Sequence, residues 1–428
     1  MDVLTRGKYN FNGLDKLSQL VIVYSKYIQG FPNYLGIHAG GILISEKPIH
    51  YYCATFLPPK GFATTQFDMI VAEDIGLYKF DILSQRGLGK IKDTVEIVKY
   101  NHPEKESIDI HDIKRFKEDK RIKHLLRNAK AIGCFYVESP AMRMLLKKLQ
   151  VDNYLGLVAA SSVIRPGVAK SGMMREYILR YRYPERRKEA YPVLLDIMPE
   201  TYGVMVYQED VIKVAHAIAG MSLGEAEGLR KCMSKKRDWE RMETYRNRFL
   251  DGAKDNGIDE ETRNEIWRQI ESFAGYAFAK GHSASYAVES YQSLYLKCYF
   301  PLEYMVATVN NGGGFYRTET YLQEAKKKGA IIHPPCINKS QIKTIIKGNN
   351  IYLGFQHLQS FEKKNIVAII NERHNGLFSS LHNFMDRVPM SLEQLDLLIR
   401  IEAFRTLNIN QRQLLWEAHY KNNSTPKV

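Results

Sequence analysis

Hydrophobic and polar residues follow two different spacings along this chain of 428 residues, and the spacing changes near Gln85. The segment LDKLSQLVIVYSKYIQG, residues 14–30, repeats apolar side chains at a helical interval and stops at Gly30, which predicts one helix. Three short runs rich in β-branched and aromatic residues follow, GGILIS, YYCATFLP and GLYKFDIL, with Pro and Gly between them. Such runs predict strands.

Beyond Gln85 the spacing is helical almost throughout, up to about Ala325. After the segment GAIIHPPCIN, a hairpin-like stretch around NNIYLGF precedes two small helical units that end near Arg405. The chain contains no internal repeat at the periods of solenoid proteins. The pattern therefore predicts a small β-containing fragment, a large helical domain and a small helical unit at the C-terminal end.

The length and composition indicate an ordinary globular protein of two or three domains. Hydrophobic residues make up 45% and charged residues 25% of the chain. No run approaches the roughly 18 apolar residues that a membrane helix needs, and the first residues lack a secretory signal, so we expect no membrane and a cytoplasmic protein. The five cysteines lie far apart without a CxxC pair, which favours reduced thiols over disulfides or zinc ligands.

The net charge is more informative than the composition. A formal charge of +14 and an isoelectric point near 9.3 favour a polyanionic partner, bound through phosphate contacts and counterion release. A basic surface alone does not establish nucleic-acid binding, since many proteins are simply basic. The class of partner therefore has to be inferred from particular residues.

Asp81 is the first candidate for chemistry. It stands in an apolar strand, and Lys79, two positions earlier, lies on the same face because strand side chains alternate. A carboxylate beside a cation at a strand edge suits metal-assisted phosphoryl transfer, in which Mg²⁺ is held by a few carboxylates and the substrate phosphates. For these two residues alone, a strand aspartate paired with its neighbouring lysine is the other interpretation.

A group of cations and a group of polar residues lie at helix ends. The first group lies in LRKCMSKKR and has two interpretations: it binds a triphosphate or a template backbone, or it is a solvated helix end. The second lies at a Gly-containing turn before a helix, where free N–H groups and the helix dipole favour anions, or it caps that helix. Tyr286 and Tyr291 follow and suit stacking on a base or sugar. The candidates are Arg230, Lys231, Lys235, Lys236 and Arg237 in the first group, and Lys280, His282 and Ser283 in the second.

Two further segments have two interpretations each. REYILRYRYPERRKE, residues 175–189, mixes arginines with tyrosines as a template-binding surface does, and it equally suits a surface helix whose tyrosines reach the core. QLDLL, residues 394–398, resembles a sliding-clamp-binding pentapeptide. The apolar spacing of the helix around it favours core packing instead.

The segments IHAGGILISEKPI, TTQFDM and EDIGLYKFDILSQRGLGKI, in this order, resemble the palm blocks of the bacterial DNA polymerase III alpha-subunit family, the family C DNA polymerases. The resemblance implies that Asp81 is one of three aspartates that bind Mg²⁺, and that Lys79 contacts phosphate or primer. It also implies dNTP or DNA binding by residues of the flanking blocks, which are His38, Gly40, Gly41 and Gln66, with Asp68 as a further matching position.

Five further segments resemble the fingers blocks of this family, in the family's order: CFYVESPAMRMLLKKL, IRPG, TYGVMVYQEDV, LRKCMSKKR and GYAFAKGHSASYAVESYQSLYLKCYFP. Tyr136 stands where the family usually has Gln, and Ala277, Ala279 and Gly281 replace Gly, Asn and Ser. The resemblance implies dNTP and DNA binding by Arg165, by both of the groups at helix ends, and by Tyr286 and Tyr291.

The fold that the resemblance implies is α+β and mostly α. A small β-containing partial palm of the polymerase-beta-like nucleotidyltransferase type precedes a large helical fingers domain and a small helical hairpin unit. In the last region Cys336 stands where the family has Asp, and Ser360 and Phe361 replace glycines of the turn. The implied ranges are 1–35 for the end of the thumb, 36–95 for the C-terminal part of the palm, 96–330 for the fingers and 331–428 for the start of the tandem helix-hairpin-helix region.

The implied function is template-directed DNA synthesis in chromosomal replication, in which a dNTP adds to a primer 3′-hydroxyl with two Mg²⁺ ions. The implied partners are primer–template DNA, dNTP, the N-terminal part of the polymerase and other subunits of the DNA polymerase III holoenzyme. The family's other two aspartates belong to a Pro-Asp-x-Asp-x-Asp-Phe block that these 428 residues do not contain, so we expect the isolated chain to be inactive. The alternatives are a non-catalytic DNA-binding relic of a truncated gene and one half of a split polymerase.

Overall fold

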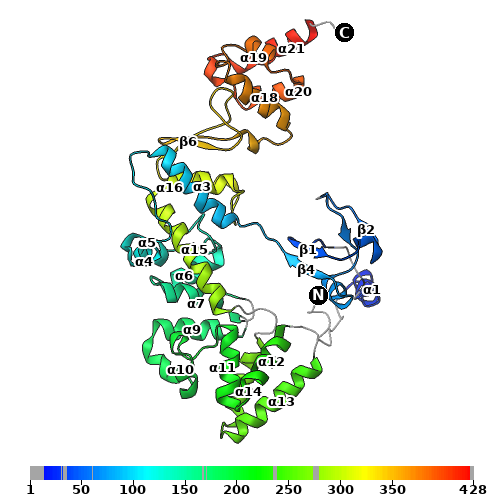
Figure 1. Cartoon of the computed structure of the whole chain (residues 1–428), viewed down its shortest axis with the longest axis vertical. Helices are drawn as coiled ribbons and strands as arrows, with labels where there is room; N and C mark the ends of the chain where they lie inside the picture. Colours follow the sequence, from blue (N-terminus) through cyan, green and yellow to red (C-terminus); the bar gives the residue numbers. More distant parts are fainter. Residues whose placement is uncertain are drawn as a thin grey trace. The chain divides into compact units, whose positions relative to one another are not determined.

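The computed structural model describes residues 14–29, 31, 36–59, 61–165, 168–169, 171–234, 239–272 and 279–424. The chain divides into two compact units, Met1–Gln85 and Arg86–Val428 (Figure 1). Helices make up most of the described residues, and the sheets are small. The expected fold class, α+β and mostly α, is confirmed.

The first unit is built around two short pairs of antiparallel strands. Strand β1 pairs with β4, so that Gly41 lies opposite Asp81 and Leu43 opposite Lys79, and β2 pairs with β3. The predicted strand runs GGILIS and GLYKFDIL contain β1 and β4, while the palm type stays a prediction. The elements are α1 (Lys16–Ser25), β1 (Gly41–Ile44), η1 (Ile49–Tyr51), β2 (Thr55–Phe56), β3 (Thr64–Thr65), α2 (Met69–Asp74) and β4 (Tyr78–Asp81).

Apolar side chains of the first unit remain exposed. Helix α1 buries none of its side chains. Ile42 and Ile44 on β1 and Phe80 on β4 are also exposed. Two-stranded sheets are marginally stable in water unless another layer covers them. The first unit therefore presents apolar surface that suits packing against additional polypeptide.

The second unit begins with the large helical region that the apolar spacing predicts. The expected palm–fingers boundary at residue 95 falls inside α3, which packs on α16, and the domain ranges stay predictions. The elements are α3 (Arg86–Asn101), α4 (Ile113–Glu118), α5 (Lys120–Arg127), α6 (Pro140–Leu149), α7 (Tyr154–Val163), α9 (Met173–Arg182), η2 (Pro184–Glu189), α10 (Pro192–Ile197), η3 (Pro199–Thr201), α11 (Gln208–Ala219), α12 (Leu223–Ser234), α13 (Trp239–Asp255), α14 (Glu260–Ser272), α15 (Lys280–Tyr299), α16 (Pro301–Asn310) and α17 (Thr318–Lys326).

Helix α15 is the centre of this region. It contacts α3, α4, α5, α7 and α16 (Figure 1), and its side chains from Ser290 to Lys297 are all buried. Helix α7 begins after Asn153, whose side chain accepts a hydrogen bond from the N–H of Gly156, and is buried from Gly156 to Val163. Its small side chains let the two helices approach closely. Among the described residues, no helix combines the length and the apolar composition needed to span a membrane.

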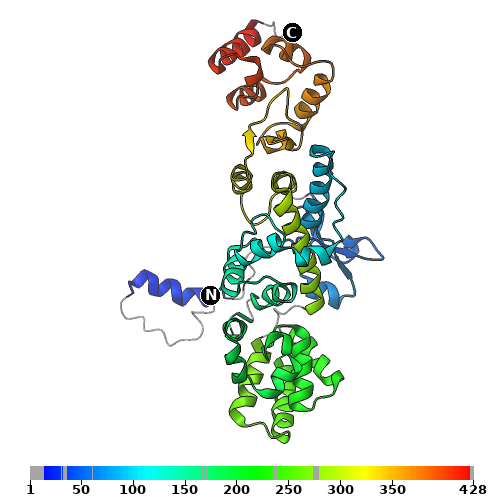
Figure 2. The ribbon, with the colours of Figure 1, turned by 90° about the vertical axis from the view of Figure 1, so that its left-hand side faces the viewer.

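The C-terminal region of the second unit has a small sheet and a separate helical bundle. The strand order is β5-β7-β6, with β5 parallel and β6 antiparallel to β7. Figure 2 shows the bundle in orange and red. Its own core contains Phe384, whose ring lies 4.9 Å from that of Phe378 and 5.0 Å from that of Phe404. The elements are β5 (Ile331–His333), β6 (Ile345–Lys347), β7 (Asn350–Tyr352), η4 (Phe355–His357), α18 (Lys363–Arg373), α19 (Leu381–Arg387), α20 (Leu392–Arg400), η5 (Arg405–Leu407) and α21 (Gln411–Ser424).

The turn before α18 holds a serine in a left-handed backbone conformation. Ser360 has φ +59°, a region that glycine adopts without strain. The Gln394 side chain fixes this turn, because it donates to the carbonyl of Ser360 at 2.8 Å and accepts from the N–H of Glu362 at 2.9 Å. Gln394 belongs to α20, where Leu395 and Leu398 are buried as well. The QLDLL segment therefore packs in the core, as its apolar spacing predicts.

Replacing Ser360 with glycine is expected to stabilise the C-terminal bundle by about 0.5–1 kcal/mol, because a left-handed non-glycine residue costs about 1–2 kcal/mol and the chain entropy of glycine offsets part of the gain. Hydrogen–deuterium exchange of α18 and α20 measures the change. Ser379→Gly is the matched control, since Ser379 is exposed and its φ is not positive, and it is expected to destabilise slightly. Weaker protection in Ser360→Gly than in the wild type contradicts the prediction.

Candidate functional site

In the first unit, Asp81 ends strand β4 with its carboxylate held by Lys79 of the same strand. Lys79 Nζ donates to Oδ2 of Asp81 at 2.9 Å and lies 2.8 Å from Oδ1. This hydrogen bond is the main cause that lowers the pKa of Asp81, with further contributions from the charges of Lys79 and His38. The side chain of Asp81 is 48% exposed. The strand alternation therefore brings Asp81 and Lys79 together as predicted, and the carboxylate is ionised and open to solvent.

His38 lies beside this carboxylate because two glycines give it room. Its Nδ1 accepts hydrogen bonds from the N–H groups of Gly41 at 2.6 Å and Gly40 at 3.2 Å, and lies 3.7 Å from Oδ1 of Asp81. A Cβ on Gly40 would lie 2.4 Å from the carbonyl oxygen of Ile82, and one on Gly41 would lie 2.8 Å from Nδ1 of His38. Both glycines thus act through close backbone packing.

The other two residues of the first-unit blocks lie between β3 and α2. Gln66 is in the turn that follows β3. Asp68 caps α2, because its carboxylate accepts from the N–H groups of Ile70 and Val71, each at 3.0 Å. The matching position Asp68 therefore has a helix-capping role, and binding by Gln66 stays a prediction.

In the second unit, Arg165 is held by a tyrosine that the sequence does not single out as a partner. The hydroxyl of Tyr136 accepts from Nη2 of Arg165 at 2.5 Å and donates to the carbonyl of Ser161 at 2.9 Å. The guanidinium also lies 5.4 Å from the centre of the Tyr136 ring. Tyr136 has φ +65°, so its backbone adopts a costly conformation that presents this ring to Arg165.

Aromatic rings from α15 complete this cluster. The Tyr286 ring lies 4.9 Å from the ring of Tyr136 and 5.0 Å from that of Phe135, both at steep angles. The ring of His282 lies 4.1 Å from that of Tyr286. Burial, and then the charge of Arg165, lower the pKa of His282, so the imidazole is neutral at pH 7. The structure thus brings together three of the predicted site residues, Arg165, His282 and Tyr286.

Two predicted residues of α15 lie in the core instead. Tyr291 is 0% exposed, and burial raises the pKa of its hydroxyl. Its ring packs beside Tyr154 of α7, so stacking on a base would require it to leave the core, and we exclude it from the proposed ligand set. The buried hydroxyl of Ser283 lies 2.6 Å from that of Ser162 on α7. These two residues join α15 to α7.

The N-terminus of α15 already receives an anion. The N–H of Lys280 donates to both carboxylate oxygens of Glu209, at 3.1 and 3.2 Å. The ammonium of Lys280 forms an ion pair with Glu200 and lies 5.7 Å from the centre of the Tyr207 ring. This helix end thus favours an anion, as expected from its free N–H groups, and in this structure the anion is a side chain of the protein. Sequence reasoning missed both glutamates.

The predicted group of cations on α12 is partly neutralised. Arg230 donates through Nε and Nη2 to the two oxygens of Glu227, each at 2.8 Å, and through Nη1 to Gln208 at 3.2 Å. The hydrogen bond to Glu227 raises the pKa of Arg230. Lys231 Nζ lies 3.7 Å from the same carboxylate. The remaining members of the group, Lys235, Lys236 and Arg237, lie outside the described residues.

The segment REYILRYRYPERRKE is anchored to the core. Tyr177 is buried. Arg180 donates to the carbonyl of Tyr202 at 3.1 Å, and the guanidinium of Arg187 lies 4.0 Å from the centre of the Tyr202 ring. These contacts favour the interpretation as a surface helix whose tyrosines reach inward.

A half-buried acid in α15, Glu289, was not singled out from the sequence. Burial raises the pKa of Glu289 to about 7, and the charge of Lys90 on α3 opposes this rise. A Cβ on Gly87 would lie 1.9 Å from Oε1 of Glu289, so only glycine leaves room for the carboxyl group there. Lys90 is itself buried, and burial lowers its pKa. The residue spacing along α15 does not show that Glu289 lies against α3, so this contact could not be predicted from the sequence.

Known protein families match residues in both units of the chain. Residues 7–84 match the model of the bacterial DNA polymerase III alpha NTPase domain, residues 87–257 that of the alpha-subunit finger domain, and residues 329–414 that of a helix-hairpin-helix motif. The DNA polymerase III subunit alpha of Aquifex aeolicus is 31% identical over 405 residues, which are 94% of this chain and 34% of the relative. The chain belongs to the bacterial DNA polymerase III alpha-subunit family.

Two further relatives are similar to most of the chain. The DNA polymerase III subunit alpha of Staphylococcus epidermidis is 34% identical over 396 residues, 91% of this chain and 36% of the relative. A protein named error-prone DNA polymerase from Symbiobacterium thermophilum is 30% identical over 428 residues, 94% of this chain and 38% of the relative. The chain therefore spans little more than a third of the length of these relatives.

The described residues do not form a complete metal site of the kind an alpha-subunit polymerase implies. Among them, no group of three or more His, Cys, Asp or Glu side chains is arranged to hold a metal ion. Mg²⁺ prefers several oxygen ligands in octahedral geometry. Asp81 offers one ionised carboxylate, which Lys79 now occupies. Asp81 could therefore supply one ligand to a metal site that other polypeptide completes. The described residues alone do not supply enough ligands for two metal ions.

The raised pKa of Glu289 predicts a pH-dependent effect of Glu289→Gln. An unfolded glutamate ionises near pH 4.3, whereas the folded carboxyl has a pKa of about 7. The unfolded chain therefore binds fewer protons between these values, and this group lowers folding stability as pH rises through that window. Glu289→Gln is expected to raise the melting temperature relative to wild type more at pH 8 than at pH 5.

Thermal unfolding of both proteins at the two pH values measures this difference. Glu243→Gln is the control, because Glu243 is an exposed residue of α13, and its effect should be the same at both pH values. An equal shift of the Glu289→Gln melting temperature at pH 5 and pH 8 contradicts the prediction.

Proposed function

We propose that this chain supplies the nucleotide-binding fingers and one catalytic carboxylate of a template-directed DNA polymerase that acts in chromosomal replication. In this reaction a dNTP adds to the 3′-hydroxyl of a primer, and pyrophosphate leaves. The observation that carries the proposal is the ionised, solvent-facing carboxylate of Asp81, held by Lys79 at the end of β4. The family to which the chain belongs, whose relatives are named DNA polymerases, supports this reaction class.

The cluster on α15 is the proposed binding site for the dNTP. The guanidinium of Arg165 gives a charge-assisted contact to phosphate oxygens. The neutral imidazole of His282 and the ring of Tyr286 offer a face for the sugar or base. The triphosphate would then replace the carboxylate of Glu209 at the N-terminus of α15, where Lys280 supplies a cation.

The proposed chemistry needs carboxylates beyond Asp81. We propose that two Mg²⁺ ions are held by three aspartates, of which Asp81 is one, and that the other two come from polypeptide outside these 428 residues. The exposed apolar side chains of Ile42, Ile44 and Phe80 suit packing against that polypeptide. The isolated chain is accordingly proposed to be inactive. The other holoenzyme subunits and a cytoplasmic location follow from the same role.

DNA is the proposed macromolecular partner of both units. The net charge of +14 favours a polyanion, and residues 329–414 match a helix-hairpin-helix motif. The same charge also favours a second candidate, a DNA-binding protein without catalysis. The two candidates differ in one outcome, because only the polymerase extends a primer once the remaining carboxylates are supplied.

Primer extension with the chain and a polypeptide that carries the Pro-Asp-x-Asp-x-Asp-Phe block of an alpha-subunit relative tests the proposal. We expect extension by the mixture and none by either part alone. Asp81→Asn should slow extension by on the order of a thousandfold, because a carboxylate ligand contributes several kcal/mol to holding the metal charge. The matched control is Asp74→Asn, at an exposed aspartate of α2, which should leave the rate unchanged.

Two results would contradict the polymerase proposal. Undiminished extension by Asp81→Asn would remove Asp81 from the reaction. Salt-sensitive DNA binding by the mixture, without any extension, would favour the non-catalytic DNA-binding protein.

A further inference from the structure

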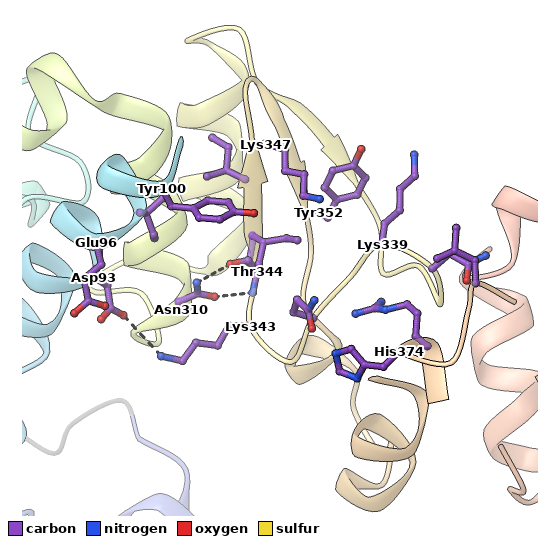
Figure 3. Close-up of a pocket in the computed structure, with 17 residues that line it drawn as sticks. Asp93, Glu96, Tyr100, Asn310, Lys339, Lys343, Thr344, Lys347, Tyr352 and His374 are labelled. Carbon is purple, nitrogen blue, oxygen red and sulfur yellow. Dashed lines mark hydrogen bonds and ion pairs between the residues drawn. The ribbon is translucent and has the colours of Figure 1, made fainter. Parts of the chain in front are cut away.

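The second unit contains a cavity that none of the proposed polymerase residues lines. Its volume is about 920 Å³, within the range of about 300–1,000 Å³ that is usual for ligand sites. Its walls come from α3, from the strands β6 and β7, and from the end of α18 (Figure 3). Lining residues include Asp93, Glu96, Tyr100, Lys339, Lys347 and Tyr352.

The framework of this cavity is fixed by paired side-chain and backbone hydrogen bonds. Asn310 accepts from the N–H of Thr344 and donates to its carbonyl, both at 2.8 Å (Figure 3). Arg373 donates to the carbonyls of Ile337 at 3.1 Å and Ser340 at 2.7 Å, which holds the loop before β6. The cavity is therefore preformed, and a ligand would bind without first ordering its walls.

Two tyrosines give the cavity aromatic surfaces. Tyr352 of β7 is stacked on His333 of β5 with ring centres 4.6 Å apart, so its ring is held as a rigid plate. Tyr100 of α3 also lines the cavity and is 72% exposed (Figure 3). Exposed rings of this kind bind the flat faces of nucleobases.

The charges of the cavity are divided between its walls. On the α3 side, Asp93 forms an ion pair with Lys343 at 3.8 Å, and Glu96 lies beside Tyr100 (Figure 3). On the strand side, Lys339 and Lys347 both line the cavity, and Lys339 Nζ lies 5.5 Å from the centre of the Tyr352 ring. Within the described part of the chain, neither lysine has a carboxylate at ion-pair distance. One wall thus suits the N–H donors of a base, and the other suits a phosphate.

We propose that this cavity binds a nucleotide unit, with the base against Tyr100 and the phosphate at Lys339 and Lys347. A nucleotide supplies both a flat base for the Tyr100–Glu96 wall and a phosphate for the two lysines, whereas an apolar ligand leaves both lysines without a partner. The unit is a free nucleotide or one residue of a single-stranded nucleic acid, since both carry this chemistry. The site uses none of the side chains assigned to DNA synthesis above, so it can fail while that proposal stands.

Photocrosslinking of the full 428-residue chain locates the ligand directly. Two probes carry the same photoreactive base: 5-iodo-dUMP, and an oligothymidylate with one 5-iododeoxyuridine. After irradiation, peptide mass spectrometry is expected to find the crosslink on Tyr100 or Tyr352. A crosslink with both probes identifies a free-nucleotide site, and one with the oligonucleotide alone identifies a single-strand site.

Charge-reversal variants test the assigned phosphate contacts. Lys347→Glu should lower the crosslink yield at Tyr100 and Tyr352 by roughly tenfold or more, because it removes a charge-assisted contact and adds repulsion. Lys327→Glu makes the same change of charge on a 71% exposed lysine outside the cavity and should leave the yield unchanged. Tyr100→Ser should weaken binding of the successful probe by roughly five- to a hundredfold.

Crosslinks from both probes that avoid Tyr100 and Tyr352 would overturn the proposal. So would equal losses of yield in Lys347→Glu and Lys327→Glu, which would show a response to net charge alone. Because Tyr100 and Lys347 are exposed, both variants are expected to keep the wild-type circular dichroism spectrum.

Discussion

The packing of α15 against α7 is the constraint on which the proposed nucleotide site depends. The small residues of α7 allow a close approach, and the Ser162–Ser283 hydroxyl pair at 2.6 Å and the bond from the Tyr154 hydroxyl to the carbonyl of Ala284 at 2.8 Å hold the two helices in register. Arg165 follows α7 directly, and Tyr286 projects from α15 one turn after Ser283. The helix pair thus sets the distance between the cation and the aromatic face.

The first unit depends on a different constraint, the register of β1 on β4. Gly41 lies opposite Asp81 in this pairing, and the absence of a Cβ there leaves room for His38 and for the Lys79 side chain. A shift by one residue would move Asp81 and Lys79 to the other face together. The sheet has only two strands and exposed apolar side chains, so the geometry of the carboxylate would be completed by polypeptide that packs against it.

Local patterns predicted the parts of the site that depend on neighbours in sequence. Strand alternation was enough for the Lys79–Asp81 pair, and apolar spacing was enough to assign QLDLL to the core. Local patterns did not separate Tyr286 from Tyr291. The two residues lie about 140° apart around one helix, so Tyr286 joins the Arg165 cluster while Tyr291 is buried in the core. The buried face of α15 also carries Ser290 and Gln292, so hydrophobicity does not mark it.

Contacts between distant segments were beyond prediction from one sequence. The sequence predicts that Lys280 binds phosphate. In the fold Lys280 instead contacts Glu200 and Glu209, which are more than 70 residues away along the chain. Tyr136 likewise gains its role from Arg165, 29 residues away.

Hydrogen–deuterium exchange of the 428-residue chain with and without saturating dNTP and Mg²⁺ tests most directly whether the second unit holds a nucleotide at the α15 cluster. We expect dNTP to increase the protection of residues 280–290 and of the residues around Arg165. A deoxynucleoside, which has no phosphates, should not increase it. Unchanged exchange in both segments at dNTP concentrations that support extension by the complemented chain would contradict it.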